Sequence, residues 1–234
     1  MSRARYRLAS GVLTGARGGV ILLTVLDTPK RDRVAERREA TRRDILQAAW
    51  DLARENGLSS LTLRDVAERV GMRAPSLYSH FESKHAIYDA MFGQAWSDYE
   101  VAQREAATDL PAHPRSALKQ MSHHYYDFAT QDLARHQLMD VRVIPGFEPT
   151  PEAYAPAVRV LENGRRTLSE HGIDSDDDFD LWVAIIGGLV NQHHANDPGG
   201  TRYAGLLDRA VDMWADAVGL PPEPTPPRPR RTRR

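Results

Sequence analysis

Apolar residues recur every three or four positions through most of the chain, which is the spacing that places them on one face of an α-helix. Glycine and proline punctuate these segments where helices are expected to end or begin. The pattern therefore predicts an all-α fold. The predicted helices span residues 37–56, 63–70, 84–107, 115–130, 133–143, 152–171, 179–195 and 201–218, with a further short helix beginning around residues 73–75.

Two short helices joined by a glycine stand out between residues 62 and 84. Thr62 occupies an N-cap position with Asp65 three residues later, an arrangement that satisfies free amides at a helix start. Gly71 stands where a left-handed residue would end that helix, and Pro75 is tolerated in the first turn of the next one. Two helices joined by a tight glycine turn are a helix-turn-helix.

The second of these helices is expected to turn Leu77 and Phe81 inward. Its outer side would then combine cationic, hydroxyl and aromatic groups, which suit a DNA groove and its phosphates. That side carries Arg73, Ser76, Tyr78 and His80. The alternative for Tyr78 is a packed aromatic ring, and for His80 a solvated surface residue.

Composition and charge narrow the setting. The 234 residues are 41% apolar and include no cysteine, which fits a folded protein of a reducing cytoplasm without disulfides or thiolate metal sites. Residues 1–92 carry 16 Lys and Arg against 11 Asp and Glu, whereas residues 93–220 carry 10 against 20. A surface for a polyanion is therefore expected near the N-terminus. No apolar run approaches the roughly 20 residues needed to span a bilayer, so no membrane partner is expected.

The predicted organisation has four parts. Residues 1–38 lack a sustained period and are interpreted as a flexible basic extension, which either touches DNA phosphates or is an unstructured leader. Residues 39–92 would form the helix-turn-helix domain, and residues 93–219 a helical body. Residues 220–234, rich in proline and arginine, would be a disordered tail.

The string from Gly71 to Phe81, followed by Ser83 and Lys84, resembles the DNA-binding domain of the tetracycline-repressor (TetR/AcrR) family over about residues 41–91. The resemblance implies an N-terminal three-helix DNA-binding domain, a C-terminal ligand-binding and dimerisation domain, and an operator as partner. It also implies phosphate contacts from Thr62, Tyr78, His80 and Lys84, and contacts with base edges from Arg73, Ala74 and Ser76. Arg42 and Arg43 complete the candidate DNA-binding residues. Independently, Lys84 lies at a helix start that favours a phosphate, and arginine can pair bidentately with guanine.

Aromatic and methionine residues in the helical body are candidates for an effector pocket, which would suit a small, mostly apolar or aromatic ligand. For each of them the alternative is a place in the core. They are Trp96, Tyr99, Met121, His124, Tyr125, Phe128, Met139, Phe147 and Trp182.

The last two predicted helices are apolar enough to pair with their copies in a second chain as a four-helix bundle. A homodimer would let two recognition helices bind a palindromic operator, with the effector releasing it. The predicted interface comprises Ile185, Leu189, His193, Leu206, Ala210, Met213 and Trp214.

The remaining chemistry gives no catalytic or cofactor site. Asp176, Asp177 and Asp178 head a predicted helix, where negative charge is favoured; a metal site is the sharper alternative. The two histidines of each adjacent pair, 123–124 and 193–194, point about 100 degrees apart on a helix and cannot both coordinate one metal ion. No zinc-protease, nucleophile-elbow or phosphate-loop motif is present. An enzyme is not expected. The second hypothesis keeps the helical body as a small-molecule carrier or enzyme and makes the helix-turn-helix a packing element.

Overall fold

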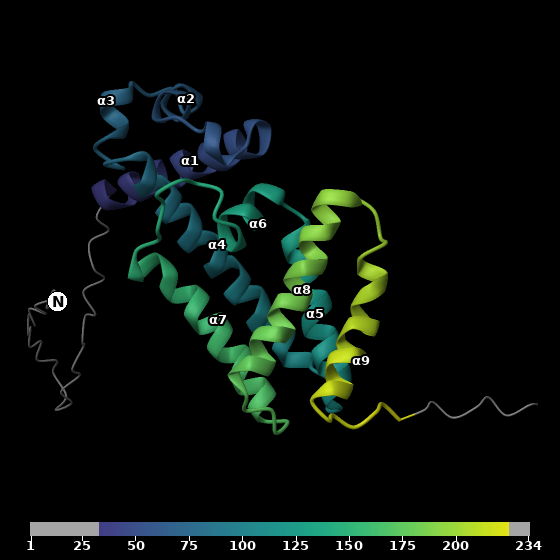
Figure 1. Cartoon of the computed structure of the whole chain (residues 1–234). Coiled ribbons are helices and arrows are strands. Elements are labelled where there is room, and N and C mark those ends of the chain that lie inside the picture. Colours follow the sequence, from purple (N-terminus) through teal and green to yellow (C-terminus); the bar gives the residue numbers. More distant parts are fainter. Residues whose placement is uncertain (1–32, 225–234) are drawn as a thin grey trace, which may run out of the picture. The chain divides into compact units, whose positions relative to one another are not determined.

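The computed structural model describes residues 33–224, and all regular elements in this range are helical, which confirms the predicted fold class (Figure 1). The chain divides into two compact units, Met1–Glu39 and Ala40–Arg234, and the account below concerns the second unit. None of the helices within residues 33–224 is long and apolar enough to cross a membrane. The helices are α1 (Arg33–Asn56), α2 (Leu63–Arg69), α3 (Ala74–Leu77), α4 (Lys84–Ala106), α5 (Pro114–Thr130), α6 (Leu133–Asp140), α7 (Pro151–Ser169), α8 (Asp176–Asn196) and α9 (Leu207–Ala217), with single 3-10 turns η1 (Leu58–Ser60), η2 (Ala107–Asp109) and η3 (Ala204–Leu206).

One apolar cluster holds the helix-turn-helix onto α4 and continues into α6 and α7. Ile45, Val66 and Leu77 are fully enclosed, so α1, α2 and α3 each contribute to a single core. Tyr88 of α4 is also fully enclosed, and its hydroxyl donates a hydrogen bond to the carbonyl of Leu58. Because the side chains of α1, α2 and α3 pack in the same core as α4, the start of α4 is fixed to the helix-turn-helix.

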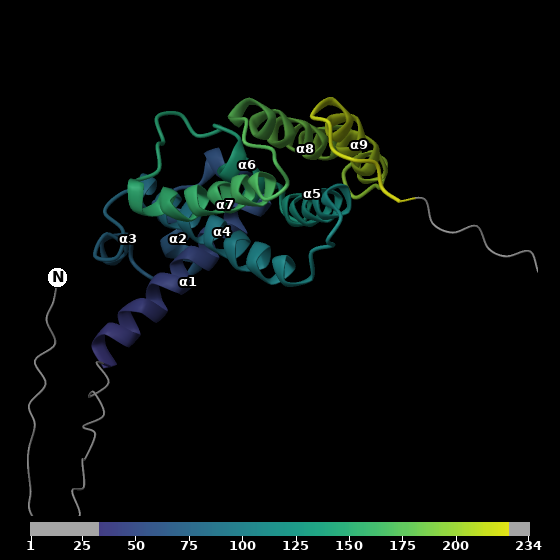
Figure 2. The same cartoon turned by 90° about the horizontal axis from the view of Figure 1, so that it is seen from below.

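Helices α4 and α7 pack closely and run in the same direction (Figures 1 and 2). A Cβ on Gly93 would lie 3.3 Å from the Cα of Ala153, so glycine permits the close approach. Further along, Arg159 binds both carboxylate oxygens of Glu100 at 2.8 and 2.7 Å. The pair is bidentate and its carboxylate is buried, so it stabilises the α4–α7 contact more than an exposed ion pair would.

A second apolar cluster joins α5, α8 and α9, which Figure 2 shows gathered side by side. Leu118, Val190, Leu207 and Val211 are fully enclosed in it. The three acidic residues of the predicted helix start lie in the first turn of α8, and the hydroxyl of Ser175 caps that helix by accepting from the amide of Asp178 at 3.2 Å. Within the described residues, no group of His, Cys, Asp or Glu is arranged to hold a metal ion.

Several predicted boundaries were wrong. Residues 33–38 are helical rather than part of a flexible extension, while residues 1–32 lie outside the described range. The predicted domain division at residue 92 lies within α4, as the helix predicted over residues 84–107 implied, and it stays a prediction. Helix α6 ends at Asp140 rather than residue 143, and its C-cap residue Val141 already has an extended backbone.

The last helix begins at Leu207 rather than residue 201. The carboxylate of Asp197 accepts a hydrogen bond from the backbone amide of Arg202 at 2.8 Å, which extends the preceding turn, and η3 then takes the chain to Leu207. Residues 220–223 were predicted to begin a disordered tail, but Leu220 is buried and Glu223 is held by polar contacts. Residues 225–234 lie outside the described range.

Candidate DNA-binding surface and ligand cavity

The first half of the helix-turn-helix is built by local capping, as the sequence predicts. The hydroxyl of Thr62 accepts a hydrogen bond from the amide of Asp65 at 3.2 Å and donates one to its carboxylate at 2.7 Å. At the other end, Gly71 has a φ of 69°, and the amide of Met72 donates to the carbonyl of Ala67 at 2.8 Å. The left-handed glycine lets the chain turn sharply into α3.

Helix α3 has one buried side and one open side. Leu77 and Phe81 are buried at 0% and 2% exposure, which confirms their predicted inward orientation. Arg73, Ser76 and Tyr78 are exposed, and 55% of Tyr78 is accessible to solvent. An exposed aromatic ring beside a cation and a hydroxyl is the arrangement expected of a surface that binds DNA, and the alternative of a packed ring for Tyr78 was wrong.

Arg42, one of the candidate DNA-binding residues, makes contacts inside the domain. Its guanidinium lies 4.1 Å from the centre of the Phe81 ring and donates a hydrogen bond to the carbonyl of His80. Both contacts lie inside the domain, so Arg42 fixes α1 against the segment after α3. The neighbouring Arg43 is exposed and stays a candidate for DNA contact.

The other predicted positions are partly enclosed. Ala74 packs against the core cluster and is half-buried, so only part of its methyl group faces outward. His80 is also half-buried, and its Nδ1 is enclosed without a partner among the described residues. Lys84 lies at the start of α4, with its ammonium 5.6 Å from the centre of the Tyr88 ring. The hydroxyl of Ser83 caps α4 by accepting from the amide of Ala86 at 3.0 Å.

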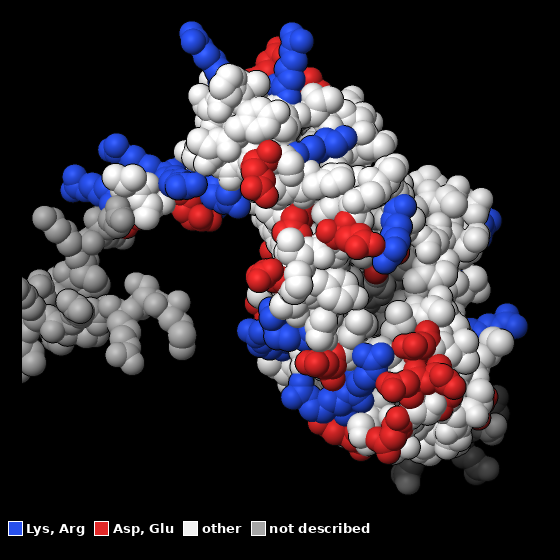
Figure 3. Space-filling view, turned by 60° about the vertical axis from the view of Figure 1, so that its left-hand side comes forward, with Lys and Arg blue, Asp and Glu red and all other residues white. Residues whose placement is uncertain are grey.

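Charged side chains are unevenly spread over the face drawn in Figure 3. Lys and Arg project at the top of the view, the level at which α2 and α3 lie in Figure 1. Asp and Glu gather with further Lys and Arg at the lower end. This agrees with the charge asymmetry of the sequence and favours polyanion binding near the helix-turn-helix.

A cavity of about 800 Å³ opens in the helical body. Its walls come from α4, α5, α6, α7 and α8. Seven of the nine predicted pocket residues line it. They are Trp96, Tyr99, Met121, His124, Tyr125, Met139 and Trp182.

Two of the predicted pocket residues are half-buried and pack against the core instead. Phe128 packs against Tyr99, with ring centres 4.9 Å apart, and lies under the guanidinium of Arg135 at 4.5 Å. Phe147 contacts the Tyr88 ring at 5.8 Å and, like Phe128, is absent from the cavity wall. Each therefore follows the alternative that periodicity alone left open.

Four rings form a continuous aromatic cluster in the cavity wall. Tyr99 lies at its centre, with Tyr125 at 5.3 Å, His124 at 6.1 Å and Trp96 at 6.3 Å between ring centres. Trp96 is buried, with 7% of its surface exposed. Its Nε1 and the Nε2 of His124 are enclosed without hydrogen-bond partners among the described residues. The second tryptophan, Trp182, differs, because its Nε1 donates to the hydroxyl of Ser122 at 3.1 Å.

A carboxylate, Asp140, also lines the cavity, and its partners are within the protein. Its Oδ2 lies 3.2 Å from Nδ1 of His136, whose Nε2 lies 2.9 Å from the side-chain oxygen of Asn191 on α8. Burial alone would lower the pKa of His136, but the hydrogen bonds with Asp140 and Asn191 outweigh it and raise the pKa. Burial, followed by the charge of Asp140, raises the pKa of Tyr125.

Sequence reasoning missed the contribution of α7 to the cavity. Val160, Leu161, Gly164 and Asn163 all line it, together with Gln103 of α4. The residues of α7 show helical spacing in the sequence, but small and aliphatic side chains carry no signal that separates a cavity wall from a core.

The outward faces of α8 and α9 differ from the predicted dimer interface. His193 and Trp214 are buried within the chain, and the indole of Trp214 donates to the carbonyl of Asp178 at 3.0 Å, so neither is available to a partner. Leu206 and Met213 are exposed, and Ile185, Leu189 and Ala210 are half-buried. The prediction omitted Leu181 and Val183 of α8, which are both exposed.

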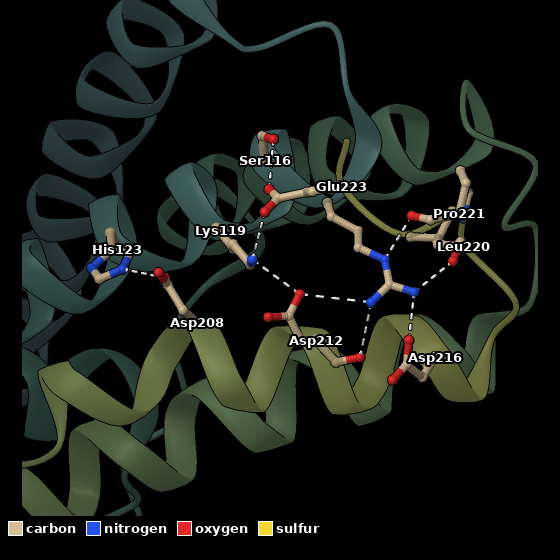
Figure 4. Close-up of polar contacts among 10 residues, drawn as sticks. Ser116, Lys119, His123, Asp208, Asp212, Asp216, Leu220, Pro221 and Glu223 are labelled. Atoms are coloured by element: carbon tan, nitrogen blue, oxygen red, sulfur yellow. Dashed lines mark hydrogen bonds and ion pairs between the residues drawn. The ribbon is translucent and has the colours of Figure 1, made fainter. Parts of the chain in front are cut away.

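A ladder of polar contacts holds α9 to α5 on another side (Figure 4). Asp208, Asp212 and Asp216 are spaced four residues apart on α9, so they lie on one stripe. They pair in turn with His123, Lys119 and Arg115 of α5. Because the carboxylates face α5, the ladder leaves the apolar Leu206 and Met213 uncovered.

A model of the family described as bacterial regulatory proteins, tetR family, matches residues 45–91. The chain is similar to the tetracycline repressor protein class A from transposon 1721 of Escherichia coli, with 47% identity over 190 residues, 74% of this chain and 80% of that repressor. It is also similar to the HTH-type transcriptional repressor KstR2 of Mycobacterium tuberculosis, with 33% identity over 88 residues. That match covers 38% of this chain and 44% of KstR2, so the chain spans less than half of that relative.

The arrangement of helices is similar to that of solved structures. A protein with unknown function from Rhodococcus sp. RHA1 superposes with a TM-score of 0.66 at 18% identity. The superposition covers 75% of this chain and 94% of that protein. At this identity the similarity shows a common fold.

Proposed function

This chain belongs to the tetR family of bacterial regulatory proteins, and we propose that it acts as a homodimeric repressor that binds a palindromic operator and leaves it when a small effector binds. Members of the family are DNA-binding transcriptional regulators rather than enzymes. The observation that carries the proposal is the open side of α3, where Arg73, Ser76 and Tyr78 are exposed while Leu77 is fully buried. A rigid scaffold that presents cationic, hydroxyl and aromatic groups suits contact with bases and phosphates.

A homodimer would account for binding to a palindromic operator. Two copies of α3 related by a two-fold axis bind half-sites one helical turn of DNA, or a multiple of it, apart. Leu181 of α8, Leu206 of η3 and Met213 of α9 are exposed apolar residues, which supports a partner on these elements because exposed apolar surface favours association. We place the protein with its operator in the cytoplasm.

The cavity supports release by an effector. Its size suits a small organic molecule, and its aromatic walls suit an apolar or aromatic one. The relative from Escherichia coli is named as a tetracycline repressor, so tetracycline is the first compound to test. A ligand that binds the released conformation about tenfold more tightly would weaken operator binding by the same factor.

A mobility-shift titration of the full chain against its own upstream DNA tests the operator proposal. We expect a sequence-specific complex that weakens steeply as salt rises, since phosphate contacts release counterions. A carrier with a helix-turn-helix used only for packing would form no such complex. Light scattering at micromolar concentration tests the dimer, and a monomer there would contradict it.

Arg73→Ala tests the base-reading role. If Arg73 pairs with a guanine, its loss costs about 1–3 kcal/mol on the operator and reduces discrimination against a mutated half-site. A uniform loss of affinity on both DNAs would instead make Arg73 a phosphate contact. Arg202→Ala is the matched control, because Arg202 is exposed in the turn before η3 and lies outside both the helix-turn-helix and the predicted interface residues.

A further inference from the structure

Three histidines gather where α6 meets α8. His136 of α6 is 2% exposed, and its ring stacks on that of His194, at 5.1 Å between centres and 21° between planes. The His194 ring lies 5.5 Å from that of His193, which is also buried. Imidazole is the side chain that gains or loses a proton near neutral pH, so three of them in contact make this junction sensitive to protons.

Both ring nitrogens of His136 face oxygen atoms. Nδ1 lies 3.2 Å from a carboxylate oxygen of Asp140, and Nε2 lies 2.9 Å from the side-chain oxygen of Asn191 on α8. A neutral imidazole has one N–H and can donate to only one of these oxygens, whereas an imidazolium donates to both. The arrangement therefore requires a proton on His136, with Asp140 as its counter-ion. Burial opposes that proton, but the two hydrogen bonds outweigh burial and raise the pKa of His136 above its usual 6.5.

His194 is held in the neutral form. Its Nε2 lies 3.0 Å from the carbonyl oxygen of Ala129, so this nitrogen carries the N–H of the neutral ring. A second proton on His194 would place two cations in stacked rings. Burial lowers the pKa of His194 below 6.5; the hydrogen bond to Ala129 opposes this effect, and the charge of His136 adds to it.

We propose that the cluster is a proton switch: α6 is held on α8 while His136 alone carries a proton, and this contact loosens when His136 loses its proton or His194 gains one. The bond from His136 to Asn191 is decisive, because it joins the two helices directly. Helix α6 also contributes Met139 and Asp140 to the cavity wall, so its contact with α8 sets the position of part of that wall. The inference goes beyond the proposed function and does not depend on it, since neither DNA nor an effector takes part.

Other charged or titratable side chains surround the cluster and its partners from α1, α4, α5, α6 and α8. Asp140 favours a proton on His136, and Asp132 favours one on His194. Asp132 is already paired with the guanidinium groups of Arg54 and Arg135, so a second proton is poorly compensated. The surrounding side chains are Arg54, Asp98, Tyr99, Tyr125, Tyr126, Asp132, Arg135, Asp140 and His193.

The two histidines act on opposite sides of pH 6.5. Because the pKa of His136 is raised on folding, the stability that it contributes is fully present below pH 6.5 and is lost as pH rises through the raised pKa. Because the pKa of His194 is lowered, its contribution is present above pH 6.5 and is lost as pH falls through the lowered pKa. The contact between α6 and α8 should therefore be strongest near pH 6.5 and weaken on both sides.

An NMR titration of the histidine side chains in the full chain tests the two protonation states. We expect His136 to titrate above pH 6.5 and His194 below it. His136→Gln removes the neighbouring cation, so the pKa of His194 should rise towards 6.5. Asn191→Ala removes one acceptor at an exposed position, so the pKa of His136 should fall. His123→Gln is the matched control, because His123 also pairs with an aspartate, at 2.8 Å, but lies outside the cluster; it should change neither pKa.

Amide hydrogen exchange of α6 measures the contact itself, with rates expressed as protection factors so that the intrinsic effect of pH is removed. Protection should be greatest near pH 6.5. As pH rises, it should fall by about tenfold for each unit by which the pKa of His136 is raised. This dependence should disappear in His136→Gln and persist in His123→Gln.

Four results would each overturn the proposal. They are a pKa of His136 at or below 6.5, a pKa of His136 that stays constant or rises in Asn191→Ala, a pKa of His194 that is unchanged in His136→Gln, and α6 protection in the unaltered chain that stays constant above pH 6.5. Circular-dichroism melts establish that each variant folds. If His136→Gln does not fold, Asn191→Ala takes its place in the exchange experiment, because it leaves all three rings in the chain.

Discussion

Arg115 is the most enclosed charged side chain of the α5–α9 ladder, and replacing it measures what the ladder contributes. Its side chain is 6% exposed. The guanidinium donates to the carbonyls of Pro221 at 2.7 Å and Leu220 at 2.6 Å, and to the carboxylate of Asp216 at 2.5 Å. One side chain therefore ties α5 to the end of α9 and to the segment that follows it.

Arg115→Met keeps the aliphatic part of the side chain and removes the charged fork. The Asp216 side chain is 72% exposed, so water replaces that contact at little cost. Leu220 is buried, and its carbonyl would lose its partner without access to water, at a cost of about 1–3 kcal/mol. Part of that cost is offset because a buried cation no longer needs to be desolvated. We expect the free energy of unfolding to fall by about 2 kcal/mol.

Urea unfolding at fixed protein concentration measures this loss, and the melting temperature should fall by roughly 4–8 °C. Lys119→Met is the matched control, four residues along the same helix. Its partners Asp212 and Glu223 are 41% and 37% exposed, so its loss should cost less than about 1 kcal/mol. The reasoning is refuted if the two variants lose equal stability, or if Arg115→Met unfolds within about 0.5 kcal/mol of the unaltered chain.

Two further predictions concern the turn and the α4–α7 contact. Gly71→Ala should lower the free energy of unfolding by about 1 kcal/mol because of the φ of 69°, although no atom lies within 4 Å of the added methyl group. Gly187→Ala is equally uncrowded but lies inside α8, so it should raise the free energy of unfolding by about 0.5–1 kcal/mol. Thermal melts in which both variants shift in the same direction would contradict this. The hydrogen bond from Arg159 lowers the pKa of Glu100 below its usual 4.5. The stability that it contributes is therefore present above pH 4.5 and is lost as pH falls through the lowered pKa, so urea titrations should show Glu100→Gln less stable at pH 7 and converging with the unaltered chain below pH 4.5.

Local chemistry made much of the fold predictable. Ser83 caps α4 and Pro114 begins α5, and both starts fall within one residue of the prediction. Capping acts over three or four residues, so the sequence displays it directly. The exposed face of α3 followed from the same kind of reasoning, because Leu77 and Phe81 stand where only an inward orientation buries them.

Contacts between distant segments could not be predicted in this way. Periodicity marks Trp214 as apolar, but only the position of the Asp178 carbonyl, 36 residues away, makes it a core residue rather than an interface residue. The sequence likewise gives no sign that Arg42 lies on Phe81. Phe128 and Tyr99 both follow the helical spacing of apolar residues, yet of the two only Tyr99 lines the cavity. Whether empty volume lies beside a ring depends on every helix around it.

Several contacts connect the cavity and the helix-turn-helix, and two of them, an ion pair and α4, differ in how they can transmit ligand binding. Arg54 of α1 pairs with Asp132, the cap of α6, at 2.9 Å, which joins a 43% exposed guanidinium to a 6% exposed carboxylate through one long side chain. Helix α4 is different, because it begins beside the recognition segment and carries Trp96 and Tyr99 in the cavity wall about three to four turns later. A continuous helix with an enclosed start moves as a unit. A ligand that displaces Trp96 would therefore reorient α3 through α4, and breaking the Arg54 ion pair should leave most of that coupling in place.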